Sequence, residues 1–109
     1  MAKRCFRLKK NKEIEKVYKN GKRAFSQTIT LVYFPAKDTR FAVCVGKKYG
    51  KSVERNKIKR LLREAFARYG SEIRPCNLLL IPKIQESYSV ADFARDLNAI
   101  FTKEKLYRD

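Results

Sequence analysis

Histidine is missing from this sequence of 109 residues. Its absence removes both the most common general base and the most common metal ligand, so few side chains remain that could support catalysis on their own. The three cysteines, Cys5, Cys44 and Cys76, are odd in number and form no CxxC pair. Neither a disulfide framework nor a zinc site is therefore indicated, and a reducing compartment fits.

Long apolar segments are also missing. No run approaches the roughly 18 residues that a membrane-spanning helix needs, and the basic start MAKRCFRLKK is followed by neither a signal-peptide core nor a lipidation motif. We therefore expect a cytoplasmic protein that has no membrane partner. A length of 109 residues with 44% hydrophobic residues predicts a single domain over residues 1–109.

Acidic residues are scarce and basic residues are clustered. The chain has 27 Lys and Arg against 11 Asp and Glu, a net charge of +16. Residues 1–23 hold ten bases and two acids, and residues 47–63 hold eight bases and one acid, so these two segments carry nearly all of the excess. Such segregation favours a surface that follows a nucleic-acid backbone over a generally solvated surface.

Hydrophobic patterning predicts two helices and three strands besides the basic segment. Residues 11–20 suit a short helix with Asn11 as N-cap and Asn20-Gly21 as its end, and residues 89–101 suit a final helix capped by Ser89 and Asp92. Residues 26–35 and 39–46 are typical of strands and predict an antiparallel hairpin. Residues 76–83 are apolar on both faces, which predicts a central strand.

The segment from Gly46 to Phe66 predicts a helix whose residues are sorted by face. Its expected core face consists of Ile58, Leu61, Leu62, Ala65, Phe66 and Tyr69. A second face, which we call the basic stripe, consists of Arg55, Asn56, Lys59, Arg60 and Arg63. Glu54 and Glu64 both lie outside the stripe. A solvated helix normally interleaves charges of opposite sign, so a stripe without acids indicates contact with phosphates.

Alternation along the first two of these strands predicts a second surface. Ile29, Leu31 and Tyr33, with Phe41, Val43 and Val45, should face the core. The opposite face carries the smaller residues Thr28, Thr30, Val32, Ala42, Cys44 and Gly46. Beside Ile14 and Tyr18, and rimmed by the basic amino terminus, these residues would form a shallow trough for an extended single strand. The alternatives are that Tyr18 caps the core, that Cys44 is a small buried residue and that Lys57 is merely solvated.

The sequence KKYGKSVERNKIKRLLREAF, residues 47–66, resembles the signature of the bacterial ribonuclease P protein subunit. The positions that match are Lys47, Lys48, Gly50, Val53, Arg55, Asn56, Lys59, Arg60, Arg63, Glu64 and Phe66. The opening RLKKNKEIEKVYKNG and the ending LY match as well, so the resemblance spans nearly the whole chain. Two positions depart from the family pattern: Lys57 replaces an arginine and loses its planar fork, and Ile14 replaces an aromatic residue.

The resemblance implies an α/β fold, an α+β two-layer sandwich similar to the second domain of ribosomal protein S5. In that fold a mixed sheet packs on helices, and the basic helix connects two parallel strands by a left-handed crossover. General rules alone would favour a right-handed connection.

The resemblance also implies a function, namely assisting the removal of the 5′ leader from precursor tRNA, with hydrolysis performed by the RNA subunit. The expected partners are the ribonuclease P RNA and precursor tRNA, with no obligate protein partner. Residues expected to contact the catalytic RNA are Lys47, Lys48, Arg55, Asn56, Lys57, Lys59, Arg60 and Arg63. Residues expected to line a cleft for the leader are Ile14, Tyr18, Thr28, Thr30, Val32, Ala42 and Cys44.

No catalytic or metal-ligating residue of the protein is expected, and Mg²⁺ is expected on the RNA. Asp92 and Asp96 lie one helical turn apart and are the one carboxylate pair placed to share Mg²⁺, but capping and solvation explain them better. The alternative functions are a small ribosomal protein that neutralises folded RNA, a self-sufficient nuclease and a DNA-binding regulator. No second basic helix suggests a recognition-helix arrangement, which speaks against the regulator.

Overall fold

A five-stranded mixed sheet forms the centre of the computed structural model, which describes residues 6–7 and 11–108. The strands are β1 (Phe6–Arg7), β2 (Lys22–Phe25), β3 (Ile29–Pro35), β4 (Arg40–Val43) and β5 (Cys76–Pro82). Their order in the sheet is β1-β4-β5-β3-β2, in which β5 is parallel to β4 and antiparallel to β3. The prediction that residues 76–83 form a central strand is confirmed.

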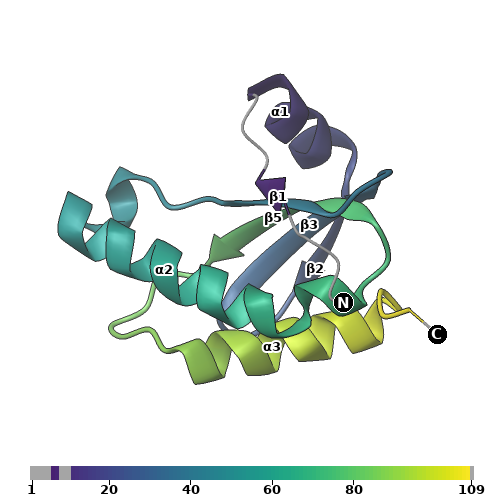
Figure 1. Cartoon of the computed structure of the whole chain (residues 1–109). Coiled ribbons are helices and arrows are strands. Elements are labelled where there is room, and N and C mark those ends of the chain that lie inside the picture. Colours follow the sequence, from purple (N-terminus) through teal and green to yellow (C-terminus); the bar gives the residue numbers. More distant parts are fainter. Residues whose placement is uncertain (1–5, 8–10, 109) are drawn as a thin grey trace.

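Helices cover both faces of this sheet unequally. The helices are α1 (Asn11–Asn20), α2 (Ser52–Tyr69) and α3 (Val90–Lys103), with the 3₁₀ turns η1 (Lys47–Tyr49) and η2 (Gly70–Glu72) flanking α2. Helices α2 and α3 lie side by side against one face (Figure 1). Helix α1 packs on the opposite face. The expected sandwich of sheet and helices is therefore present, with α1 added on the second face.

The main core lies between the sheet and the pair α2 and α3. Ile29, Leu31 and Phe41 are buried there, as strand alternation predicts. The expected core face of α2 is confirmed at Ile58, Leu62, Ala65 and Phe66, while Leu61 and Tyr69 are partly buried. The ring of Phe66 stacks on that of Phe41 at 4.4 Å between centroids. This packing leaves the basic stripe on a side of α2 that the core does not use.

The predicted hairpin between residues 26–35 and 39–46 is wrong. Strand β5 lies between β3 and β4, and β3 instead forms a hairpin with β2, a strand that the pattern did not reveal. A strand that is apolar on both faces is stabilised most at the centre of a sheet, so β5 separates the two segments. Helix α2 connects the adjacent parallel strands β4 and β5, as the resemblance implies. The left-handed sense of that connection stays a prediction.

Helix α1 forms a second, smaller cluster on the opposite face. Val17 packs there against Val32 of β3 and Leu79 of β5. Asn11 belongs to the helix as described, so it is not the predicted N-cap. Gly21 ends the helix as predicted, and a Cβ atom at this position would lie 2.5 Å from the carbonyl oxygen of Val17 and 2.8 Å from Cγ1 of Val32. Glycine is therefore required where the chain turns from α1 into β2.

Candidate nucleic-acid interface

The basic stripe lies on α2 as predicted. Asn56 and Arg60 are exposed, and Arg55, Lys59 and Arg63 are half-buried. Among the described residues, no ion pair neutralises Lys59 or Arg60. These two cations are therefore available to an external anion. Lys47 and Lys48 precede the helix, in η1, and both are exposed.

A tight turn fixes where α2 begins. Gly50 has φ 123°, a conformation that favours glycine, and a Cβ atom there would lie 1.9 Å from Oε2 of Glu54. The same Oε2 accepts a hydrogen bond of 2.9 Å from the backbone N–H of Lys51. The one acid within the basic segment thus satisfies an N–H group at the helix start, where the helix dipole favours a negative charge.

Tyr49 connects η1 to the sheet. Its hydroxyl donates a 2.5 Å hydrogen bond to the carbonyl oxygen of Pro82, at the end of β5. Burial raises the pKa of the Tyr49 phenol, so it stays a donor at neutral pH. The position of the first turn of α2 relative to the sheet is therefore held by a side chain.

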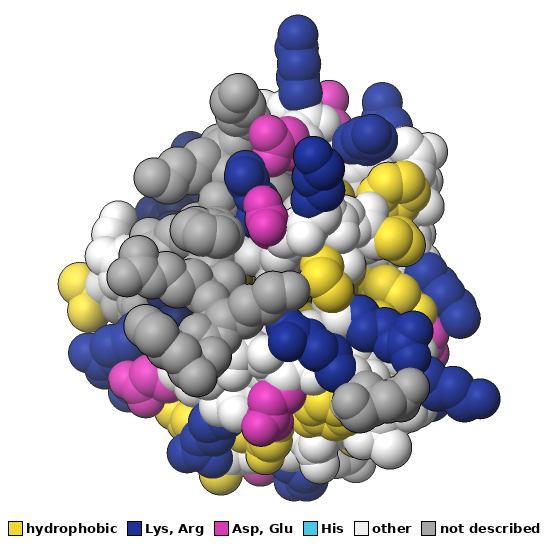
Figure 2. All heavy atoms as spheres, turned by 45° about the vertical axis from the view of Figure 1, so that its right-hand side comes forward, with side chains coloured by type: hydrophobic (Ala, Val, Ile, Leu, Met, Phe, Trp, Pro, Cys, Tyr) yellow, Lys and Arg dark blue, Asp and Glu magenta, His cyan; other side chains and the backbone are white. Residues whose placement is uncertain are grey.

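Lys and Arg side chains are spread over the face shown in Figure 2, with a few acidic side chains among them, and apolar side chains are exposed between some of them. Several of the acids are already engaged by cations. Glu104 lies 3.0 Å from Nζ of Lys22 and accepts a 2.6 Å hydrogen bond from Tyr33. The hydrogen bond from Tyr33 and that from Lys22 hold the pKa of Glu104 below its usual value. These contacts join the end of α3 to strands β2 and β3.

A groove of about 510 Å³ lies between α1 and the sheet. Three of the predicted cleft residues line it, namely Ile14, Tyr18 and Cys44. Burial raises the pKa of the Cys44 thiol, which agrees with the alternative that this residue is a small partly buried side chain and no reactive thiolate. The predicted basic rim at the amino terminus falls in a part of the chain that the structure does not describe.

Two of the predicted cleft residues do not line the groove because they are buried. Val32 is fully buried beneath Val17 of α1. Thr28 precedes β3, so the alternation of that strand does not extend to it. Its hydroxyl and its backbone N–H instead both donate to Oδ2 of Asp96 in α3, on the core side. The prediction that Thr28 and Val32 line the cleft is therefore wrong.

Thr30 and Ala42 lie on the predicted face but outside the groove lining. Thr30 is opposite Phe25 of β2 and Ile81 of β5, and it is half-buried. Ala42 is half-buried and packs on the cluster beneath α1. Neither residue is among those that line the groove.

Sequence reasoning missed the floor of the groove. Leu79 and Ile81 of β5 line it, together with Tyr49 from η1. The position of β5 next to β4 was not predicted, and so its contribution to the same face was not predicted either. One signal could have indicated this contribution. Residues 76–83 are apolar on both faces, so some of their side chains must lie on the side of the sheet opposite α2.

Lys57 lies away from the groove and on a different side of α2 from the basic stripe. It is exposed and lines a separate pocket beside the segment 84–88. The lysine that stands here in place of the family's arginine therefore does not change the basic stripe.

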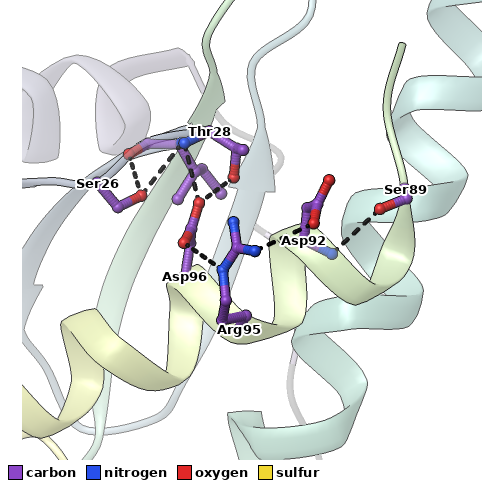
Figure 3. A network of polar contacts seen from close by, with 7 residues as sticks. Ser26, Thr28, Ser89, Asp92, Arg95 and Asp96 are labelled. Carbon is purple, nitrogen blue, oxygen red and sulfur yellow. Dashed lines mark hydrogen bonds and ion pairs between the residues drawn. The ribbon is translucent and has the colours of Figure 1, made fainter.

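Asp92 and Asp96 are engaged within the protein (Figure 3). Arg95 contacts both carboxylates, at 3.3 Å and 3.2 Å, and Ser89 accepts a hydrogen bond from the N–H of Asp92 as the predicted cap. Burial opposes the charge on Asp96, but the hydrogen bonds from Thr28 and the contact with Arg95 outweigh it and hold its pKa below the usual value. Within residues 11–108 no group of three or more Asp, Glu, Cys or His side chains is placed to hold a metal ion. Asp96 thus joins α3 to the segment before β3, while the contacts of Asp92 stay within the first turns of α3.

None of the helices in the described part of the chain combines the length and apolarity that a bilayer crossing requires.

Comparison with known proteins places these features in a family. The architecture and the acid-free basic stripe define a small, highly basic α/β protein in which α2 carries cations along one side. The family model for Ribonuclease P matches residues 2–105. The chain belongs to the ribonuclease P protein family.

Individual relatives agree with this assignment. The ribonuclease P protein component of Finegoldia magna is 44% identical over 79 residues, which cover 71% of this chain and 70% of that protein. The component from Syntrophus aciditrophicus is 34% identical over 110 residues, which cover 94% of this chain and 89% of that protein. The solved structure of the Staphylococcus aureus RNase P protein superposes with a TM-score of 0.82 at 26% identity, covering 96% of this chain and all of that one.

Proposed function

We propose that this chain is the RNA-binding protein subunit of ribonuclease P in its organism and assists the 5′ maturation of tRNA. One observation carries the proposal: the basic residues that the family signature places on α2 lie on one acid-free side of the helix, and no ion pair among the described residues neutralises Lys59 or Arg60. A folded RNA supplies the closely spaced phosphates that such a stripe neutralises.

The basic stripe would hold the catalytic RNA. Arginine guanidinium groups bind phosphate oxygens in a bidentate fashion, and lysines act as point charges. The hydrogen bond of Tyr49 and the turn at Gly50 set where α2 begins relative to the sheet, so the stripe has a defined position on the fold. Contacts of this kind fix position and orientation and do not read sequence.

The groove between α1 and the sheet would bind the 5′ leader of the precursor tRNA. It is shallow, and its lining residues Ile14, Leu79 and Ile81 are apolar, with Tyr18 and Tyr49 as aromatic rings. A single strand can extend along such a surface and stack its bases without sequence preference. A product without a leader would lose these contacts.

Hydrolysis of the phosphodiester would be performed by the RNA. Divalent ions that activate water need clustered carboxylates or other oxygen ligands. The carboxylate pair considered from the sequence is occupied by Thr28 and Arg95, so we assign Mg²⁺ to the RNA. The protein would bind and orient both RNAs and reduce the repulsion between their phosphates.

Reconstitution tests this function directly. At low Mg²⁺, the ribonuclease P RNA of the same organism should cleave a precursor tRNA slowly alone and much faster with the protein. A ribosomal protein or a DNA-binding regulator would give no such stimulation.

A second experiment, with the protein alone, tests for nuclease activity. One solved relative is described as a Staphylococcus aureus RNase P protein mutant with defective mRNA degradation activity. RNA-free protein should therefore be incubated with both precursor tRNA and an mRNA. We expect neither to be cleaved, and cleavage that Asp92→Asn or Asp96→Asn abolishes would favour the self-sufficient nuclease.

A further inference from the structure

A second hollow lies on the other side of η1 from the groove. This tyrosine pocket has a volume of about 360 Å³ and is formed by η1, the first half of α2 and the segment 84–88 between β5 and α3. Tyr49 and Tyr88 provide its aromatic rings. The volume lies within the range of about 300–1,000 Å³ typical of sites for small molecules.

Both tyrosines are held in place. Tyr49 is fixed by its hydrogen bond to Pro82, and the hydroxyl of Tyr88 accepts a 3.0 Å hydrogen bond from the backbone N–H of Gln85. The ring of Tyr88 also packs on Phe93 of the core, at 5.9 Å between centroids. Rings that are already ordered lose little conformational entropy when a ligand packs on them.

The pocket is electrically balanced, which is unusual in a chain of net charge +16. Lys48 and Lys57 line it, but so do Glu54 and Glu86. The two carboxylates would repel a phosphate, whereas they would not repel a neutral ring. Carboxylates accept hydrogen bonds from exocyclic amino groups such as N4 of cytosine.

Exposed apolar surface at the rim also indicates a ligand. Ile84 is 61% exposed and lines the pocket. A flat ring bound beside the two tyrosines would cover this side chain, and removing its apolar surface from water would stabilise the complex.

The pocket and the groove share a wall. Lys48 and Tyr49 line both of them. The Nζ atom of Lys48 also lies 5.5 Å from the centroid of the Tyr49 ring. A strand that follows the groove would therefore reach the mouth of the tyrosine pocket with a cation already positioned for its phosphate.

We propose that the tyrosine pocket binds one unpaired nucleobase of a single-stranded RNA segment, and that it prefers a base with an exocyclic amino group over uracil. This inference deepens the proposed function and rests on it for the identity of the RNA. The base would come either from the leader that leaves the groove or from the catalytic RNA.

Nuclear magnetic resonance of the free protein tests the pocket without any ribonuclease P RNA. Cytidine is the probe, because it carries a base and no phosphate, and uridine is the control. Cytidine should shift the methyl signals of Leu61 and Ile84, which line the pocket, and uridine should shift them less at the same concentration. No shift at these methyls, or equal shifts with both nucleosides, would overturn the proposal.

A matched pair of variants tests the pocket with RNA. Ile84→Asp places a charge in the rim, and Val53→Asp places the same charge at an apolar position on α2 that is 81% exposed and outside the pocket lining. The ligand is an oligouridine octamer with one cytidine or one abasic residue. Wild-type protein should bind the cytidine form about tenfold more tightly, as expected from stacking. This preference should disappear in Ile84→Asp and persist in Val53→Asp; an equal effect in both variants would contradict the proposal.

The same variants identify the source of the base. If Ile84→Asp weakens binding of precursor tRNA but not of mature tRNA, the base belongs to the leader. If it weakens binding of the ribonuclease P RNA alone, the base belongs to that RNA. Loss of neither affinity contradicts the proposal even when the reconstituted enzyme is active, and nucleoside binding without reconstituted activity contradicts the proposed function instead.

Discussion

The guanidinium of Arg23 lies over the ring of Tyr18, with its Cζ atom 4.5 Å from the ring centroid. The same side chain donates a 3.1 Å hydrogen bond from Nη2 to the carbonyl oxygen of Tyr18. Helix α1 is thereby joined to β2 through an aromatic ring and a cation. Tyr18 remains 50% exposed, so the ring is ordered and still has surface to offer at the groove.

Removing this ring should affect recognition of the leader selectively. Stacking of a base on an aromatic side chain is worth about 1–3 kcal/mol. Tyr18→Ala should therefore weaken binding of precursor tRNA to the reconstituted enzyme by up to that amount and leave mature tRNA unaffected, whereas Tyr18→Phe should keep the difference. Equal losses with both tRNAs would show that Tyr18 has only a structural role.

Reversing charge in the basic stripe should weaken assembly with the catalytic RNA. Lys59→Glu with Arg60→Glu should leave the circular dichroism spectrum native, because neither side chain belongs to the core, and should lower both the RNA affinity and its salt dependence. Lys83→Glu with Lys103→Glu is the matched control, since both residues are exposed and the change in net charge is the same. If the two double variants lose equal affinity, net charge and not the stripe determines binding.

The turn before α2 gives a stability prediction. Gly50→Ala would force a side chain into a left-handed backbone conformation and against Glu54, which should cost about 1–3 kcal/mol of unfolding free energy. Gly46→Ala is the control, because φ there is −100° and nothing lies within 4 Å of the new Cβ atom. Chemical denaturation should show a lower midpoint for the first variant alone.

Asp96 predicts a pH dependence of stability. Its pKa is lower in the folded state than the usual value of about 3.9, so the unfolded chain binds the proton more readily. The stabilisation is complete above about pH 5 and is lost as the pH falls through the usual value towards the lowered one. Asp96→Asn should therefore destabilise the protein at pH 7 by about 1–3 kcal/mol, with a smaller deficit in acid.

Denaturant titrations at pH 7 and in acid measure this deficit. Asp92→Asn is the control, since it removes a carboxylate from the same helix that does not contact Thr28. A deficit of Asp96→Asn that grows on acidification would contradict the role assigned to this carboxylate.

How much the sequence could predict differs between local and long-range features. The faces of α2 and the cap at Ser89 follow from periodicity and from hydrogen bonds between near neighbours, and the structure agrees with both. The pairing of β3 with β2 and β5 depends on competition among strands for the centre of the sheet, which no local pattern records. The hairpin prediction failed for that reason.

The predicted cleft also combines features that local patterns predict with features that depend on long-range contacts. Strand alternation placed Cys44 on a face that was expected to lie beside Ile14 and Tyr18 of the first helix, and these three residues line the groove together. Alternation alone did not reveal that α1 covers Val32 or that Thr28, in the connection between β2 and β3, binds Asp96, because both depend on contacts between distant segments. The partners of Thr28 and Tyr33 lie 68 and 71 residues away in the sequence.

Two bulky substitutions, one in β4 and one just after it, separate the groove from the cluster beneath α1. Cys44 lines the groove, so Cys44→Phe should fill it, reduce discrimination between precursor and mature tRNA, and leave the melting temperature close to that of the wild type. Ala42 and Cys44 both pack against the cluster of Val17, Val32 and Leu79, but Ala42 is not among the residues that line the groove. Ala42→Phe should therefore overpack the cluster and destabilise the protein by about 1–3 kcal/mol. Melting temperature and the two tRNA affinities should be measured on both variants. A stable Ala42→Phe variant would show that this residue also faces the groove, and an unstable Cys44→Phe variant would show that the contact of Cys44 with the cluster leaves no room for a larger side chain.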